Sequence, residues 1–123
     1  MRHVTQLCLL LLTCGLTGGA SAQPPARVLL VVGPSNHPPG THEVAAGARV
    51  IAHCLKTASS IGPFEVDLVE GWPADKQRLQ DVACVVFSGD RFPLAELDDV
   101  QTNMRELAEM MDAGCGIVCF HYA

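Results

Sequence analysis

The stretch RVLLVVGPSNHPPGTHE, residues 27–43, decides the fold. Its apolar run at residues 28–32 ends at Gly33, and a proline-rich loop separates this run from a helical pattern. A short, β-rich apolar run bounded by turn residues is typical of a strand buried on both faces of a parallel sheet. Ligands of open α/β sheets bind outside the carboxyl ends of such strands. We therefore expect the functional site in the loop at residues 33–41.

The rest of the chain alternates between strand and helix patterns. Strands are predicted at residues 27–32, 64–69, 82–87 and 117–122. The second of them alternates apolar and polar residues, which indicates a position nearer the sheet edge. This alternation of elements predicts an α/β fold with a parallel sheet and helices on both faces.

Two helices and a short helical turn are expected between these strands. The first helix runs from Glu43 to about residue 58, with Thr41 as its N-cap and Glu43 in its acidic first turn. A second, longest helix follows Pro93 and ends at Gly114, a suitable C-terminal cap. Its expected apolar stripe consists of Leu94, Leu97, Val100, Met104, Leu107 and Met111. The short helical turn lies within residues 74–80.

Both ends of the chain carry expectations about its organisation. Residues 1–22 resemble a signal peptide, with an apolar block and the small-residue sequence Ala20-Ser21-Ala22 before Gln23. A lipoprotein signal and an uncleaved anchor are the alternatives. We therefore expect export to the periplasm or the medium, with residues 23–123 as the folded part. The last strand pattern reaches the chain end, so we expect the N-terminal part of a larger domain, truncated after the fourth strand.

The charge pattern of the chain argues against two classes of partner. The chain has 8 Lys and Arg against 13 Asp and Glu, and loss of Arg2 with the signal peptide makes the net charge of −5 more negative. Without a basic cluster, nucleic acid and anionic membrane surfaces are not expected partners.

The four remaining cysteines lie in apolar patterns and are expected to be buried thiols, with a contact between Cys84 and Cys115 left open.

Several motifs together resemble the ThuA-like (trehalose utilisation) family, whose fold is that of the class I glutamine amidotransferases. They are SNHPPGTHE at 35–43, EGWP at 70–73, FSGD at 87–90 and GCGIVCFHY at 114–122. The resemblance implies a flavodoxin-like sheet and a role connected with carbohydrate. His121 stands where amidotransferases carry a nucleophilic cysteine, so glutamine hydrolysis is not implied. Phe92-Pro93 departs from the His-Pro pair that is frequent in the family.

Six polar residues are expected at the carboxyl edge of the sheet. His121 is a candidate general base or sugar ligand, and Asp90 is a candidate acid or a ligand of sugar hydroxyls. The candidate ligand-binding residues are His37, His42, Glu43 and Ser88. In the structural alternatives, His42 and Glu43 cap the helix, His37 is solvated, His121 is a buried histidine bonded to a backbone carbonyl, and Asp90 forms a turn.

The function expected from these features is the binding or processing of a small carbohydrate by an exported ThuA-like domain. The alternatives are a non-catalytic ligand-binding or interaction module, a metal-dependent hydrolase using His37, His42 and His121, and an inactive truncated fragment. Imidazoles with a carboxylate suit a divalent metal, but the spacing is no known metal signature and does not match H-E-x-x-H. No particular cofactor or oligomeric state is indicated.

Overall fold

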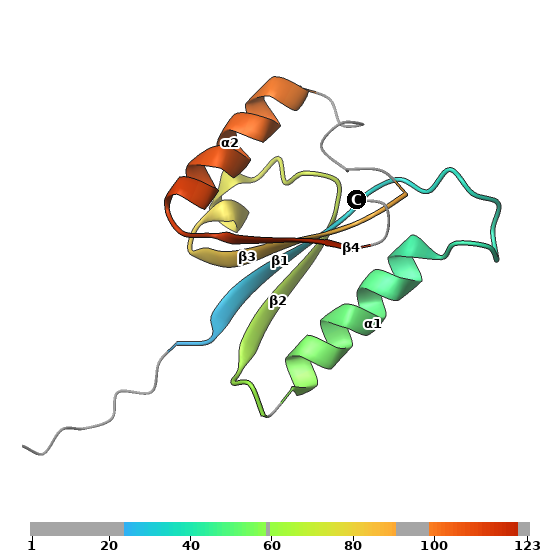
Figure 1. The fold of residues 1–123 in the computed structure, drawn as a ribbon, viewed down its shortest axis with the longest axis horizontal. Coiled ribbons are helices and arrows are strands. Elements are labelled where there is room, and N and C mark those ends of the chain that lie inside the picture. The colour runs from blue at the N-terminus through green and yellow to red at the C-terminus, as the bar shows by residue number, and fades with distance from the viewer. Residues whose placement is uncertain (1–23, 59, 91–98, 121–123) are drawn as a thin grey trace, which may run out of the picture.

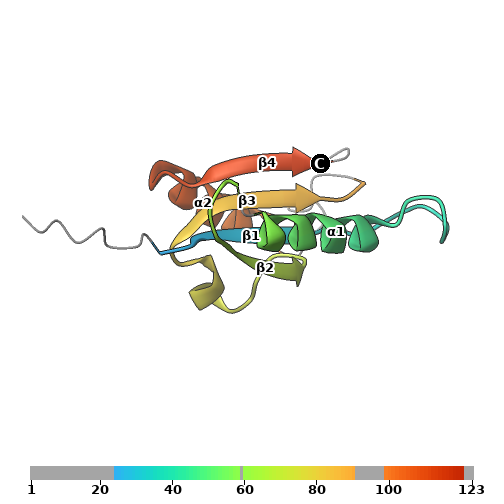
Figure 2. The ribbon, with the colours of Figure 1, turned by 90° about the horizontal axis from the view of Figure 1, so that it is seen from below.

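Four parallel strands form one sheet in a computed structural model, which describes residues 24–58, 60–90 and 99–120. The strands are β1 (Ala26–Val32), β2 (Phe64–Glu70), β3 (Val82–Ser88) and β4 (Gly116–Phe120). Their order across the sheet is β2-β1-β3-β4, with every pair parallel. Figure 2 looks onto the face that α1 covers and shows the strands side by side in this order. This order is that of a flavodoxin-like doubly wound sheet, so the expected fold class is confirmed.

One helix lies on each face of the sheet. Helix α1 (Val44–Thr57) follows β1, and helix α2 (Val100–Asp112) precedes β4. Figure 1 shows the two helices on opposite sides of the strands. The short helical turn is η1 (Lys76–Leu79), within the range expected from the sequence.

The alternation of β1 side chains supplies both hydrophobic layers. Leu30 is fully buried in the layer that includes α1, and Leu29 is fully buried in the layer that includes α2. On the α2 side, Trp72 lies 6.3 Å from Phe87 between ring centroids and its indole N–H donates to Glu106 at 2.7 Å. Trp72 therefore packs as a hydrophobic plug with a satisfied polar end.

The edge strands differ in how far they are covered. β2 is an edge strand, as its sequence pattern predicted. At the other edge, β4 presents Val118 at 46% and Phe120 at 52% relative exposure. β4 is therefore apolar in sequence, although much of its side-chain surface is exposed to solvent.

The expected apolar stripe of the second helix is right at Leu107 but wrong at Val100, Met104 and Met111. Met104 and Met111 are exposed, whereas Asn103 and Leu107 are buried and Met110 packs beside them. The buried face has the helical spacing of four and three residues, but it is rotated by about one position from the most apolar stripe. Leu94 and Leu97 lie outside the described residues. Helix α2 begins at Val100, with Asp99 as its N-cap, and has 13 residues against the 14 of α1, so the expectation that it is the longest helix is wrong.

The expected start of the first helix is also wrong in detail. Helix α1 begins at Val44, with Glu43 at the N-cap position and no side-chain cap. Thr41 is not the cap, because its hydroxyl donates to the Pro38 carbonyl at 2.6 Å. The loop before the helix therefore binds its own polar groups rather than the free N–H groups of α1.

The cysteines only partly meet the expectation of buried thiols. Cys84 and Cys115 are half-buried, and burial raises the pKa of both thiols. Cys54 and Cys119 are exposed, because they lie off the buried stripe of α1 and on the open edge strand β4. All four are free thiols.

The proposed signal peptide, residues 1–22, lies outside the described residues. Within the part of the chain that the structure describes, no helix is both long and apolar enough to cross a membrane.

Candidate functional site

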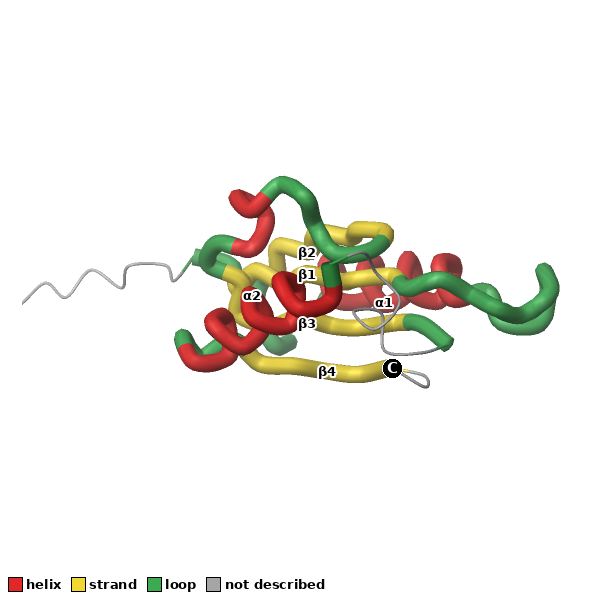
Figure 3. Tube along the Cα trace, turned by 90° about the horizontal axis from the view of Figure 1, so that it is seen from above, coloured by secondary structure: helices red, strands yellow, loops and turns green. Residues whose placement is uncertain are grey.

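β1 and β3 finish at the same level at the carboxyl edge of the sheet. Val32 pairs with Ser88 in the parallel register, and the Gly33 N–H extends the ladder by donating to the Ser88 carbonyl at 2.8 Å. β1 continues to α1 on one face of the sheet, whereas α2, after β3, lies on the other. Figure 3 shows that the segments after β1 and β3 leave the sheet at the same end. This is the topological switch point, where doubly wound sheets bind ligands.

Asp90, just after β3, is the centre of the polar groups at this point. One carboxylate oxygen, Oδ2, accepts hydrogen bonds from the Ser35 hydroxyl and from the Asn36 backbone N–H, both at 2.8 Å. The Asp90 side chain is only 5% exposed. The loop after β1 is thus fixed to the turn after β3 through one carboxylate.

The environment of Asp90 favours its ionised form. Desolvation raises the pKa of Asp90, but the hydrogen bonds from Ser35 and Asn36 and the nearby His37 and His42 together outweigh it, so the pKa is below the ordinary value of 3.8. A carboxylate in this position can orient an imidazole, accept from a ligand hydroxyl or bind a cation.

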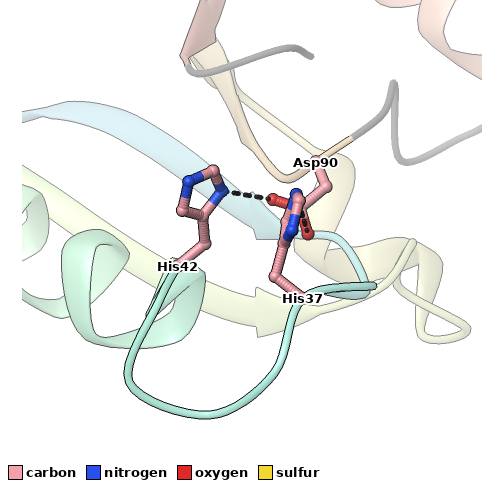
Figure 4. Close-up of side chains that lie close together, drawn as sticks. All are labelled: His37, His42 and Asp90. Atoms are coloured by element: carbon pink, nitrogen blue, oxygen red, sulfur yellow. Dashed lines mark ion pairs between the residues drawn. The ribbon is translucent and has the colours of Figure 1, made fainter.

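Two histidines of the loop after β1 flank this carboxylate. His37 Nε2 lies 3.8 Å from Asp90 Oδ2, and His42 Nδ1 lies 3.6 Å from Asp90 Oδ1. The two rings contact each other, with centroids 4.1 Å apart and planes tilted by 53°. Figure 4 shows both imidazoles beside the Asp90 carboxylate. His37 is exposed, as the solvated alternative expected, and its ring also contacts His42 and lies near Asp90.

Short-range hydrogen bonds shape the loop between the two histidines. The Gly40 N–H donates to Glu43 Oε1 at 2.6 Å, and Gly40 has a φ of +82°, a conformation that favours glycine. Together with the bond between Thr41 and Pro38, this closes a turn directly before α1. The turn returns His42 to the sheet edge, next to Asp90.

A cleft of about 210 Å³ opens beside this cluster. Its lining residues are His42, Glu43, Val44, Gly47, Ser88 and Phe120. Three of the predicted ligand-binding residues therefore share one cavity with an exposed aromatic ring from β4. His37 and Asp90 adjoin it through His42. His121 lies outside the described residues.

Ser35 and Asn36 were not predicted as site residues. They stand 55 and 54 positions before Asp90 in the sequence, so their contact with its carboxylate depends on the pairing of β1 with β3. A serine and an asparagine soon after a buried strand are the only local signal, and such residues are equally common in ordinary turns.

The fold and the site together define a class: a doubly wound parallel α/β protein with a polar cluster and a cleft at its topological switch point. No family model matches the chain, and neither a curated protein nor a solved structure matches it. The ThuA-like resemblance stays a prediction from the sequence.

Proposed function

We propose that this protein binds a small carbohydrate in the cleft at the carboxyl ends of β1 and β3. The observation that carries the proposal is a mostly apolar cleft that includes the exposed ring of Phe120 together with the polar side chains of Glu43 and His42. Sugars present hydroxyls around their edge and C–H groups on their faces, so they need polar acceptors and an apolar platform together. Export and the ThuA-like resemblance, both sequence-based expectations, point the same way.

The size of the cleft supports a small ligand. Pockets for drug-sized molecules usually enclose about 300–1,000 Å³, whereas this cleft encloses about 210 Å³. A single sugar ring suits the smaller volume. A disaccharide would place its second ring outside the cleft.

Calorimetry and thermal-shift measurements with a panel of monosaccharides and disaccharides test this proposal. We expect saturable binding of at least one sugar by the wild-type protein. Phe120→Ala should weaken it roughly two- to tenfold, the range of one aromatic stacking contact. Val118→Ala is the matched control, because Val118 is similarly exposed on the same strand and does not line the cleft. Absence of binding by any sugar in the panel would contradict the proposal.

Glu43→Gln separates the charge of this residue from its structural role. Glutamine keeps an acceptor oxygen for the Gly40 N–H, so the loop should persist while the negative charge is lost. We expect sugar affinity to fall about tenfold, because hydrogen bonds to charged groups are the stronger ones. Glu65→Gln, an exposed change on β2, should leave affinity unchanged.

Processing of the sugar is a second candidate function, favoured by the pairing of His42 with Asp90. A carboxylate beside Nδ1 holds an imidazole in the tautomer whose Nε2 can accept a proton from a hydroxyl. Mass spectrometry of sugars incubated with the protein tests for conversion. Conversion should be lost in His42→Gln and His121→Gln. If the wild-type protein leaves every sugar unchanged, processing is excluded and binding remains the proposed function.

A further inference from the structure

The cluster of His37, His42 and Asp90 has the composition and spacing of a metal site. One ligand atom from each residue can be chosen so that all three lie within 4.8 Å of one another. The two ion-pair separations run to different carboxylate oxygens, 3.6 Å from His42 Nδ1 to Asp90 Oδ1 and 3.8 Å from His37 Nε2 to Asp90 Oδ2. A tetrahedral ion with bonds of about 2.0 Å separates its ligand atoms by roughly 3.3 Å. Rotations of the exposed His37 and half-buried His42 side chains would be needed to bring the three atoms to that distance.

The surroundings of Asp90 resemble the support that metal-binding carboxylates receive. Ser35 and Asn36 both donate to Oδ2, which fixes the plane of the carboxylate, while Oδ1 faces His42. Carboxylate ligands are commonly held in this way by hydrogen bonds from outside the metal's own ligands. The carboxylate side chain is 5% exposed, and the histidines are carried on a loop fixed at both ends. These features distinguish the cluster from three polar residues that meet by chance on a surface.

We propose that His37, His42 and Asp90 bind one divalent transition-metal ion of the zinc type. Two imidazoles and a single carboxylate suit Zn²⁺, Co²⁺ and Ni²⁺, whereas Mg²⁺ and Ca²⁺ prefer sets of oxygen ligands. Three protein ligands leave at least one coordination position for water or a ligand, as in sites that activate or hold a small molecule. His42 also lines the cleft, so the ion lies at its wall.

This set differs from the metal alternative raised by the sequence. That alternative combined His37 and His42 with His121, which lies outside the described residues. Asp90 takes the third place because the register of β1 and β3 brings it to the loop after β1. The proposal does not rest on carbohydrate binding and would stand without it.

Titration of the untagged protein with Zn²⁺ after chelator treatment tests the proposal. Calorimetry should give one ion per chain, and Co²⁺ should give the visible absorption of a low-coordinate complex. Asp90→Asn and His37→Gln should each weaken Zn²⁺ binding by at least about tenfold, and Ser35→Ala by about 10- to 100-fold through the orientation of Asp90. His53→Gln, an exposed histidine on α1, is the matched control and should bind as the wild type does.

Two further measurements keep the test decisive. The side chain of His37 is half-exposed, so His37→Gln should keep the wild-type circular dichroism even if Asp90→Asn disturbs the loop. Zn²⁺ should raise the melting temperature of the wild type but not that of His37→Gln. Wild-type binding by His37→Gln, or equal binding of Mg²⁺ and Zn²⁺ by the wild type, would overturn the proposal. The titration contains no sugar, and the sugar panel is repeated with EDTA, so failure of one proposal is distinguishable from failure of the other.

Discussion

Asp90 connects two segments whose bonded residues are 55 positions apart in the sequence. Its carboxylate accepts from the loop after β1 at two points and lies against two imidazoles of the same loop. A buried carboxylate is stable only where donors or cations compensate the loss of water, and here Ser35 and Asn36 supply the donors. The same interactions that hold the loop therefore hold the candidate site in place.

Asp67 provides a pH-dependent contribution to stability at the residue scale. Arg78 donates to both of its oxygens, through Nε at 2.8 Å and through Nη2, and this lowers the pKa of Asp67 below 3.8 against desolvation. A carboxyl whose pKa is lower in the folded state stabilises the fold above the unfolded pKa, and this contribution is lost as the pH falls through the folded pKa. The stabilisation should therefore be full at neutral pH and disappear in the acid range below 3.8.

Asp67→Asn should have a lower free energy of unfolding than the wild type at pH 7. This difference should become smaller as the pH falls below 3.8. Urea unfolding at a series of pH values measures the difference. Asp112→Asn, at the exposed end of α2, removes a carboxyl without touching Arg78 and serves as the control. A constant difference between wild type and Asp67→Asn at all pH values would contradict the assignment.

At the scale of elements, the sequence-based predictions of strands and helix ends were correct where one local feature of the sequence determines the structure. Three of the strands follow from continuous apolar runs and β2 from alternation of apolar and polar residues. The glycine after α2 follows from a backbone conformation that favours glycine.

The cap of α1 was wrong because Thr41 bonds to Pro38 in a competing turn. On α2, Leu107 is buried as expected, but Asn103 and Met110 lie beside it in place of Met104 and Met111. His37, His42 and Asp90 were expected at one edge of the sheet, but their mutual contacts and the bonds of Ser35 and Asn36 to Asp90 depend on the strand register.

Gly114 tests this local cause directly. It has a φ of +99°, and the backbone N–H groups of Gly114 and Cys115 bond back to α2 at 2.9 Å and 3.0 Å. Gly114→Ala should destabilise the protein by about 1 kcal/mol, because alanine is strained in this conformation. Gly47→Ala, inside α1 with open space around the new methyl group, should instead stabilise it by about 0.5–1 kcal/mol. Thermal unfolding of both variants measures the effects, and the same sign for both would contradict this reading.

At the scale of the whole molecule, one sheet separates two hydrophobic layers that share their strands. Leu30 is buried toward α1 and Leu29 toward α2, one residue apart on β1. Because the same backbone carries both layers, loss of packing on one face should destabilise the other. We therefore expect a single cooperative unfolding transition.

Leu30→Ala tests this coupling, with Trp72 as a probe on the opposite face. Trp72 is the single tryptophan and packs against Phe87 in the layer of α2, whereas Leu30 lies in the layer of α1. The truncation should cost about 2–5 kcal/mol. The urea midpoint should fall equally by Trp72 fluorescence and by far-ultraviolet circular dichroism, since both probes report one transition. Val50→Ala, an exposed change on α1, should move neither midpoint by much. An unchanged fluorescence midpoint in Leu30→Ala would mean that the two layers unfold separately, and that the edge carrying His37, His42 and Asp90 is not held by a single core.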